Sequence, residues 1–477
     1  MTNSRHDNSI SSLVPSNSLD RFLLWLLIFT ASCAPFSTLI GMKTSSPFAA
    51  NAFIVLTLAA FVMFLRHSKE LVLDSIVRCY LIFTLLGIAS TLLMSVVLHD
   101  RVGALHGQTT FSTIVPSICW LIFNFVTVLY LRWAFTHVST GVIDKALNAL
   151  LCFTLIVSTL ELVFGGAISG VLSVWLKSYN AILSTGRLCG IATEPSTMST
   201  VLGLFCLPYC YARFRNKGEV RYLFAFLGLL VISYFTFSAT VFVTVLFVCV
   251  GIAIREIGSA IQNYGGYLVF FLCLIGAVAI LAAAVYIICY RDGSSPLIVD
   301  AVNGVLQRVT SSSDQSGAYR KSTIINDWKI FAAFPLFGVG DGNQGFFYAH
   351  NLPSWIIATG SYEVSNALNG GLGVLDGGPL IGTLVSGFGV AGSAVFIYWV
   401  ASLFNRARKG RNRMGHFYDM YLIALFGSLP VLWMNLGFKG ASVSAFIVFC
   451  LPCICDSICK PGSDRGVSVV CKESDVQ

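Results

Sequence analysis

The chain has 477 residues, of which 56% are hydrophobic and only 11% are charged. Because soluble domains have about 25% charged residues, this composition excludes an ordinary soluble protein and indicates a membrane protein with many spans. The net charge of +8 does not indicate nucleic-acid binding, whose footprint is a basic stripe on a soluble domain. No nucleic-acid partner is predicted.

Apolar runs of about 20 residues recur along the chain and predict an all-α bundle of about 12 transmembrane helices in a lipid bilayer. The strands of a membrane barrel would alternate in polarity, and these runs are continuously apolar. The first run is too long for the core of a signal peptide and directly follows Asp20 and Arg21, so it is predicted to be retained as a helix. The predicted spans are residues 21–42, 47–65, 79–98, 112–135, 146–166, 194–212, 221–237, 239–254, 267–289, 380–404, 418–436 and 440–457.

The Lys and Arg residues of the short loops predict how these helices are oriented. Residues 1–20 and 458–477 are predicted to be cytoplasmic tails, because basic residues gather on their side of the membrane. The loop near 167–193 and the large loop 290–379 are predicted on the opposite face. The basic loops are 66–78, 213–221 and 406–413.

The 15 cysteines lie almost all inside the predicted spans, where they act as small apolar residues. Cys189 stands alone in the 167–193 loop, and one cysteine cannot build a disulfide framework. Cys453, Cys455 and Cys459 gather near the C-terminal membrane edge, but zinc sites take four ligands and no histidine is near. No metal site and no cofactor is predicted.

Ionisable residues are scarce within the predicted spans, and Glu161, near a span end, is the main exception. A proton-coupled transporter buries several such groups near the middle of the bilayer. The scarcity therefore favours a functional site in the two non-cytoplasmic segments, the 167–193 loop and the large loop.

The large loop has a pattern of helices and turns. Residues 319–334 place apolar side chains at helical spacing, with Asp327 towards the polar side, and Pro335 ends the helix. The apolar face of this helix is predicted to lie in the membrane interface. Three further segments are predicted in the loop: an amphipathic helix at 297–309, a helix around His350, and a flexible Gly-rich stretch at 361–379.

Arg187 and Arg320 are the candidates for binding an anion, because the planar guanidinium matches the oxygens of a phosphate. The alternative for each is a cation that anchors its segment at the lipid headgroups. Arg187 precedes a predicted helix start, in which Glu194 is a capping residue and Pro195 occupies the first turn.

The turn 338–345 contains Gly340 and Gly342, whose backbone N–H groups could bind an anion. No βαβ unit surrounds it, so a dinucleotide site is excluded, and a plain sharp turn between helices is the alternative. His350, which Asn351 follows, is the candidate general base because histidine titrates near neutrality. The alternative is a structural histidine that only makes hydrogen bonds.

Three segments, taken in order, resemble the signature of the O-antigen polymerase and ligase superfamily, which are bacterial inner-membrane glycosyltransferases that use lipid-linked sugars. In that family the His-Asn element leads quickly into the next span, whereas here the Gly-rich residues 361–378 intervene. The segments are Arg187-x-x-Gly190-x-x-x-Glu194-Pro195-Ser196, then residues 318–342 with His350-Asn351, and then residues 386–393.

The resemblance implies a GT-C-like, metal-independent glycosyltransferase in the bacterial inner membrane. It would join repeat units carried on undecaprenyl diphosphate at the periplasmic face. His350 is the implied acceptor base, and Glu194 is a rival base or a residue that orients Arg187. The residues implied in binding the diphosphate and the substrate are Arg187, Arg320, Asn351, Gly340 and Gly342.

Two other functions stay open at this point. Within the family, a ligase would transfer finished polymer to lipid A–core, although Glu194-Pro195-Ser196 favours the polymerase branch. From another class, a flippase or transporter of lipid-linked oligosaccharides would also have about 12 helices, but it would not need the large loop. A chain-length regulator and a flippase of the same pathway are the implied protein partners.

Overall fold

The structure is a computed structural model of the chain. The predicted spans 21–42 and 267–289 lie outside the residues that the structure describes, as do the span 47–65 apart from residue 62 and the segments 297–309 and 361–378. The described residues are 62, 73–105, 107–137, 140–165, 187–190, 195–196, 198–264, 315–350, 354–357, 379–434 and 442–455.

The described part of the chain is built from helices and has no β-strand, only an isolated bridge between Leu105 and Gln108. This confirms the predicted all-α class. The helices are α3 (Ser75–Val102), α4 (Thr110–His137), α5 (Thr140–Phe164), α8 (Met198–Val201), the π-helix η2 (Leu202–Cys206), α9 (Leu207–Lys217), α10 (Val220–Phe235), α11 (Ala239–Tyr264), α14 (Gln315–Ala333), α15 (Gln344–His350), α16 (Ser354–Ile357), α18 (Leu380–Lys409), α19 (Arg411–Met414), α20 (His416–Met434), α21 (Ser442–Cys450) and the 3₁₀-helix η3 (Leu451–Cys453).

Five of these helices are long and apolar enough to cross a membrane, so the chain is a membrane protein. Each coincides with a predicted span. The short helix α10 is also apolar. The total of about 12 spans remains a prediction. The five segments are Ser75–Val102, Thr110–Trp133, Thr140–Phe164, Thr240–Ser259 and Leu380–Lys409.

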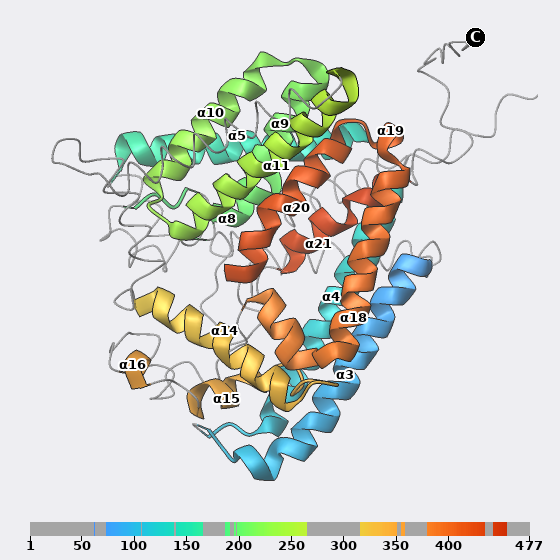
Figure 1. Ribbon diagram of the computed structural model, residues 1–477, viewed down its shortest axis with the longest axis vertical. Helices are drawn as coiled ribbons and strands as arrows, with labels where there is room; N and C mark the ends of the chain where they lie inside the picture. The colour runs from blue at the N-terminus through green and yellow to red at the C-terminus, as the bar shows by residue number, and fades with distance from the viewer. Residues whose placement is uncertain are drawn as a thin grey trace, which may run out of the picture.

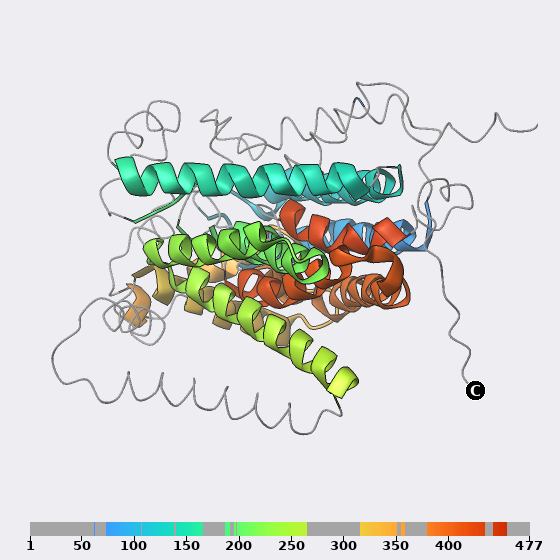
Figure 2. The ribbon, with the colours of Figure 1, turned by 90° about the horizontal axis from the view of Figure 1, so that it is seen from above.

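The bundle has two ends that differ in charge. At the basic end, the start of α3 meets the end of α4 through an ion pair between Asp74 and Arg132, and α18 ends in the exposed cations Arg408 and Lys409. The opposite end, the loop end, holds α14, α15 and the start of α18. Figure 1 shows α14 and α15 at the lower left and α19 at the upper right. Seen from above, α5 lies along one side of the bundle and α11 along the other (Figure 2).

Aromatic side chains pack α3 tightly against α18 in the middle of the bundle. The ring centroids of Tyr80 and Trp399 lie 4.8 Å apart, and those of Phe83 and Phe388 lie 5.2 Å apart. All four side chains are buried. This contact fixes the position of α18, whose first half carries part of the loop-end site.

Helix α18 is broken at Gly389, which has φ 60° and ψ −160°. In a continuous α-helix, the N–H groups of Val390 and Ala391 would donate to the carbonyls of Ser386 and Gly387. At the break these four groups turn to other partners. The first half, residues 380–388, is thus separated from the rest of α18, and the backbone that satisfies its free groups comes from the large loop.

Candidate functional site

The turn after α14 supplies the missing partners of the α18 break. Val390 and Ala391 donate their N–H groups to the carbonyls of Pro335 and Leu336, at 2.8 and 3.1 Å. In return, the N–H groups of Val339 and Gly340 donate to the carbonyls at 386 and 387, both at 2.9 Å. Two sequence segments about 50 residues apart are therefore one structural unit, which we call the stitched turn (residues 334–343 with 386–391).

Glycine is required at the closest approach within the stitched turn. Gly338 has φ 67°, and a Cβ atom placed on it would lie 2.4 Å from the carbonyl oxygen of Ser386. A Cβ atom on Gly389 would lie 2.6 Å from the backbone nitrogen of Gly338. Because no side chain fits at either position, the glycines that the sequence shows at 338 and 389 are explained by packing.

Polar side chains of α3 and α4 hold the other side of the turn. The Ser90 hydroxyl donates to the carbonyl of Phe337 at 2.6 Å, and the Thr91 hydroxyl oxygen accepts from the N–H of Asp341 at 3.0 Å. The Asn343 side chain accepts from the Thr113 hydroxyl at 2.8 Å and donates to the carbonyl of Val339 at 2.9 Å. The turn is thus fixed from three helices.

The two glycines predicted to bind an anion use their N–H groups within the protein. Gly340 donates to Gly387, as described above, and Gly342 donates to the side-chain oxygen Oε1 of Gln344 at 2.9 Å. Their φ angles of 82° and 85° lie in the left-handed region. The geometry therefore favours the sharp-turn interpretation over the anion-binding one.

Helix α14 buries its polar face. Ser322, Asn326 and Asp327 are buried, whereas Ile325 and Trp328 are each 45% exposed. The sequence placed Asp327 on the polar side correctly but gave no sign that this side packs against α18. The exposed apolar face is the one predicted to meet the membrane interface.

Asp327 lies between α15 and the first half of α18. Its oxygen Oδ1 accepts a hydrogen bond from the Tyr348 hydroxyl of α15. A Cβ atom on Gly382 would lie 2.0 Å from its other oxygen, Oδ2, so only glycine fits at that point of α18. Burial raises the pKa of the Asp327 carboxyl to about 7, and the nearby hydroxyls of Tyr348 and Ser386 offset part of this effect.

Several buried polar atoms around Asp327 have no hydrogen-bond partner of normal geometry in the described part of the chain. They are Oδ2 of Asp327, Oγ of Ser386, Nε2 of Gln344, and both amide atoms of Asn326. Buried polar groups in native proteins are nearly always paired, and unpaired ones mark sites that hold water, a proton or a ligand. We call this group the loop-end cluster.

The short segment around Arg187 lies at the same end of the bundle. Glu161, near the end of α5, accepts the N–H groups of Cys189 and Gly190 at 3.1 and 2.6 Å. The Arg187 guanidinium donates to the carbonyls of Thr236 and Phe237, at 3.2 and 3.0 Å, where α10 meets α11. Glu161, the one ionisable residue singled out near a span end, thus holds the loop that carries Arg187.

The other sequence-predicted residues are placed as follows. Arg320 lies in α14, seven residues before Asp327, and His350 is the last residue of α15. Glu194 and Asn351 lie outside the described residues. The structure therefore brings the helices of Arg320 and His350 together at the loop end. Sequence reasoning gave no role to Asp327, Tyr348 or the rest of the loop-end cluster.

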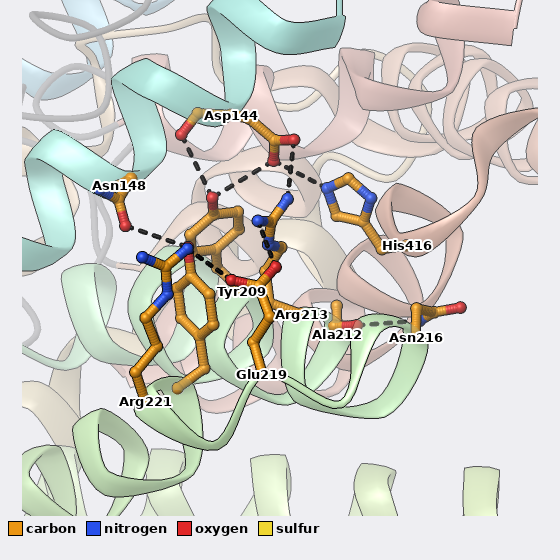
Figure 3. Close-up of polar contacts among 10 residues, drawn as sticks. Asp144, Asn148, Tyr209, Ala212, Arg213, Asn216, Glu219, Arg221 and His416 are labelled. Atoms are coloured by element: carbon orange, nitrogen blue, oxygen red, sulfur yellow. Dashed lines mark hydrogen bonds and ion pairs between the residues drawn. The ribbon is translucent and has the colours of Figure 1, made fainter. Parts of the chain in front are cut away.

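The basic end holds a second polar cluster, in which the charges are paired. Asp144 of α5 accepts from Arg213 at 3.0 Å and from Tyr209 at 3.2 Å, and its Oδ1 lies 2.8 Å from Nε2 of His416. Arg213 also pairs with Glu219 at 2.6 Å. Figure 3 shows Asp144 between these partners, which come from α9 and α20.

Asp419 of α20 extends this basic-end network to α9 and α11. Its Oδ2 accepts from Arg215 and Asn216, both at 2.9 Å, and its Oδ1 accepts from Arg255 at 2.7 Å. Both carboxylate oxygens are therefore used. Such a paired network ties helix ends together through charge-assisted hydrogen bonds to both oxygens of the carboxylate.

Within the described residues, no group of three or more His, Cys, Asp or Glu side chains could hold a metal ion. The loop-end cluster contains a buried carboxyl that can gain and lose a proton near pH 7, surrounded by unpaired hydroxyl and amide groups. No protein-family model matches the chain, and no curated protein sequence matches it.

Proposed function

We propose that the chain is a glycosyltransferase that joins glycans carried on undecaprenyl diphosphate, at the periplasmic face of the bacterial inner membrane. One observation carries the proposal. The segments 334–343 and 386–391, which belong to the motifs that resemble the polymerase and ligase superfamily, pack into the stitched turn. The helices that bear Arg320 and His350 adjoin it, beside the incompletely paired loop-end cluster.

The reaction would be attack of an acceptor hydroxyl on the anomeric carbon of the donor glycan, with loss of the lipid diphosphate. The bond from the anomeric carbon to the diphosphate oxygen breaks, and the hydroxyl proton passes to a base. Both substrates are anchored in lipid, which suits a site at the end of a membrane bundle better than one in a soluble domain.

Arg320 and Arg187 are the proposed diphosphate ligands. One well-placed donor at developing charge contributes about 3–4 kcal/mol to transition-state stabilisation in known enzymes. Arg187 already holds two backbone carbonyls, so its loss would also disturb the junction of α10 and α11. Arg320 is therefore the cleaner test of diphosphate binding. Asn351 remains a proposed contact of the substrate, whereas the N–H groups of Gly340 and Gly342 are used within the turn.

His350 is the proposed base for the acceptor hydroxyl, a role that contributes about 10²–10⁴-fold to the rate. Glu194 remains the rival base or the residue that orients Arg187. Because His350 ends a short helix that adjoins α14, small movements of α15 would change its distance from the substrate.

The test is the polymerisation of purified lipid-linked repeat units by the full chain in vesicles, with product length read on gels. Arg320→Ala and His350→Ala are expected to reduce the rate about 100-fold or more. Arg408→Ala is the matched control, since Arg408 is an exposed arginine at the basic end, and it should leave the rate unchanged. For Arg187→Ala, thermal unfolding is measured together with the transfer rate, so that a loss of folding can be told from a loss of diphosphate binding.

Near-normal chain length from Arg187→Ala, Arg320→Ala and His350→Ala would overturn the site assignment. The product also separates the two branches of the family. Longer glycan on undecaprenyl diphosphate indicates a polymerase, whereas transfer of preformed polymer to lipid A–core indicates a ligase. Movement of intact lipid-linked units across the vesicle without a new glycosidic bond would indicate a flippase.

A further inference from the structure

We infer that Asp327 is a positioning residue, whose proton holds α15, the helix that ends at His350, against the first half of α18. The inference rests on the proposed function, because it takes His350 as the residue to be positioned. It goes further by assigning a proton-dependent role to a carboxyl group that the sequence pattern did not single out.

The geometry around Asp327 fits a neutral carboxylic acid. Oδ1 accepts from the Tyr348 hydroxyl, which leaves Oδ2 beside the Ser386 hydroxyl, and neither Oδ2 nor that hydroxyl has a hydrogen bond of normal geometry. A proton on Oδ2 would let Asp327 donate to the Ser386 oxygen. The Ser386 hydroxyl could also donate to an ionised Oδ2, but that arrangement buries a charge without a cation, so the neutral acid is the form that links α14, α15 and α18 by hydrogen bonds at the lower cost.

No cation faces Asp327 among the described side chains. From α15, the group that contacts it is the Tyr348 phenol. The first half of α18, residues 380–388, has no charged residue, and Lys329 of α14 is exposed. An ionised Asp327 would therefore be a buried charge with only hydroxyl partners, which is why its pKa rises to about 7.

The direction of the effect follows from proton linkage. A carboxyl that moves into water has a pKa near 4, so the packed arrangement binds the proton more tightly than an open one does. Loss of the proton then favours separation of α15 from α18. The hold on the helix that carries His350 should therefore weaken as the pH rises from about 4 to about 7, and it should level off above that.

Hydrogen exchange of the α15 backbone amides tests this without any assay of activity. The full chain is compared with Asp327→Asn, which cannot ionise and can donate its Nδ2–H to Ser386 as the protonated acid would. At each pH the exchange rate of the wild type is divided by that of the variant. This ratio should rise about tenfold between pH 6 and pH 8.5, and a flat ratio overturns the inference.

The rate of glycan transfer gives the second test. The wild type should lose activity as the pH rises towards about 7, and Asp327→Asn should keep it, because the amide imitates the protonated acid. Tyr348→Phe removes a donor to the carboxylate and should move this decline up by about 1–2 pH units. Tyr130→Phe is the control: Tyr130 is buried, and its hydroxyl has no partner in the described part of the chain.

The two tests separate the inference from the proposed function. If the wild type transfers no glycan from any lipid-linked donor, the proposed function fails, and the exchange ratio still decides whether Asp327 holds α15. If the wild type transfers glycan but Asp327→Asn shows the same decline with rising pH, the inference fails and the proposed function stands. A Tyr348→Phe profile identical to that of Tyr130→Phe also overturns it.

Discussion

At the basic end, Asp419 accepts hydrogen bonds through both carboxylate oxygens, from Arg215, Arg255 and Asn216. At the loop end, Asp327 is just as buried but accepts one hydrogen bond, from an uncharged phenol. Two buried aspartates in one chain thus have opposite surroundings. The paired carboxylate is suited to hold helices together in its ionised form, and the other is suited to gain and lose a proton.

The comparison teaches which buried polar groups to examine for function. A charge that is fully paired contributes to the architecture, and its removal should harm folding first. A polar group that lacks a partner lowers stability, so its presence calls for another explanation. Four substitutions test this distinction, and they are given in order of decreasing effect on stability.

Removal of the Asp419 carboxylate should have the largest effect on stability. Asp419→Ala leaves the guanidinium groups of Arg215 and Arg255 without their shared partner in a partly buried site. Breaking such a pair costs about 3–5 kcal/mol. Denaturant unfolding in detergent micelles should show this loss, while transfer by the remaining folded protein stays normal. A loss below about 1 kcal/mol would contradict the role given to the network.

Asp327→Asn should change how stability depends on pH. The pKa of Asp327 is raised to about 7 in the folded protein, so between about pH 4 and pH 7 the folded state binds a proton that the unfolded state has released. Stability of the wild type therefore falls as pH rises through this interval and levels off above it. Relative to Asp327→Asn, the wild type should lose about 3 kcal/mol between pH 5 and pH 8.

A stability difference between the wild type and Asp327→Asn that does not change with pH would contradict the raised pKa of Asp327. If unfolding curves at pH 5 and pH 8 show the same difference between the wild type and Asp327→Asn, the carboxyl of Asp327 ionises with an ordinary pKa. The contrast with Asp419 would then disappear, because both carboxylates would be charged at neutral pH.

Gly389→Ala measures the contribution of the stitched turn. Gly415 provides a matched control, because its φ of 56° is similar but nothing lies within 4 Å of a Cβ atom placed there. Both substitutions strain the backbone, and only Gly389→Ala also meets Gly338 and Leu336. Gly389→Ala should cost about 2 kcal/mol more than Gly415→Ala, from the loss of about two backbone hydrogen bonds. Equal losses in thermal unfolding would show that the contact contributes nothing.

Arg221→Ala should have the smallest effect. Its side chain is 70% exposed and pairs with Glu219, which also pairs with the buried Arg213. Exposed ion pairs contribute less than about 1 kcal/mol. The midpoint of denaturant unfolding should therefore stay close to that of the wild type, and a clear loss would show that the basic-end network extends to the surface.

Much of the large loop could be predicted from local patterns. The helix expected at 319–334, its end before Pro335, the glycine turn and a helix at His350 all follow from spacing, proline and glycine, and the structure has them at 315–333, 338–342 and 344–350. These features depend on neighbours in sequence, so the sequence carries enough information to predict them.

The pairing of the turn with the α18 break could not be predicted in this way, because it joins segments far apart in the chain. The burial of Asp327 was missed for a related reason. The pattern of an amphipathic helix predicts a solvated polar face, and it carries no information about the partner surface on α18. Small residues at 382, 386 and 387 mark the face of α18 that receives Asp327 and Gln344. They are the sequence feature from which the burial of Asp327 could have been predicted.

The break in α18 also bears on how the protein is made. Within lipid, the free carbonyls of Ser386 and Gly387 and the free N–H groups of Val390 and Ala391 would each cost several kcal/mol. Their partners at 335–340 precede α18 in the chain, so the ribosome has already synthesised them when α18 enters the bilayer. A stable position of α18 in the membrane therefore depends on residues 335–340, and a chain altered in that segment would leave these four backbone groups without partners.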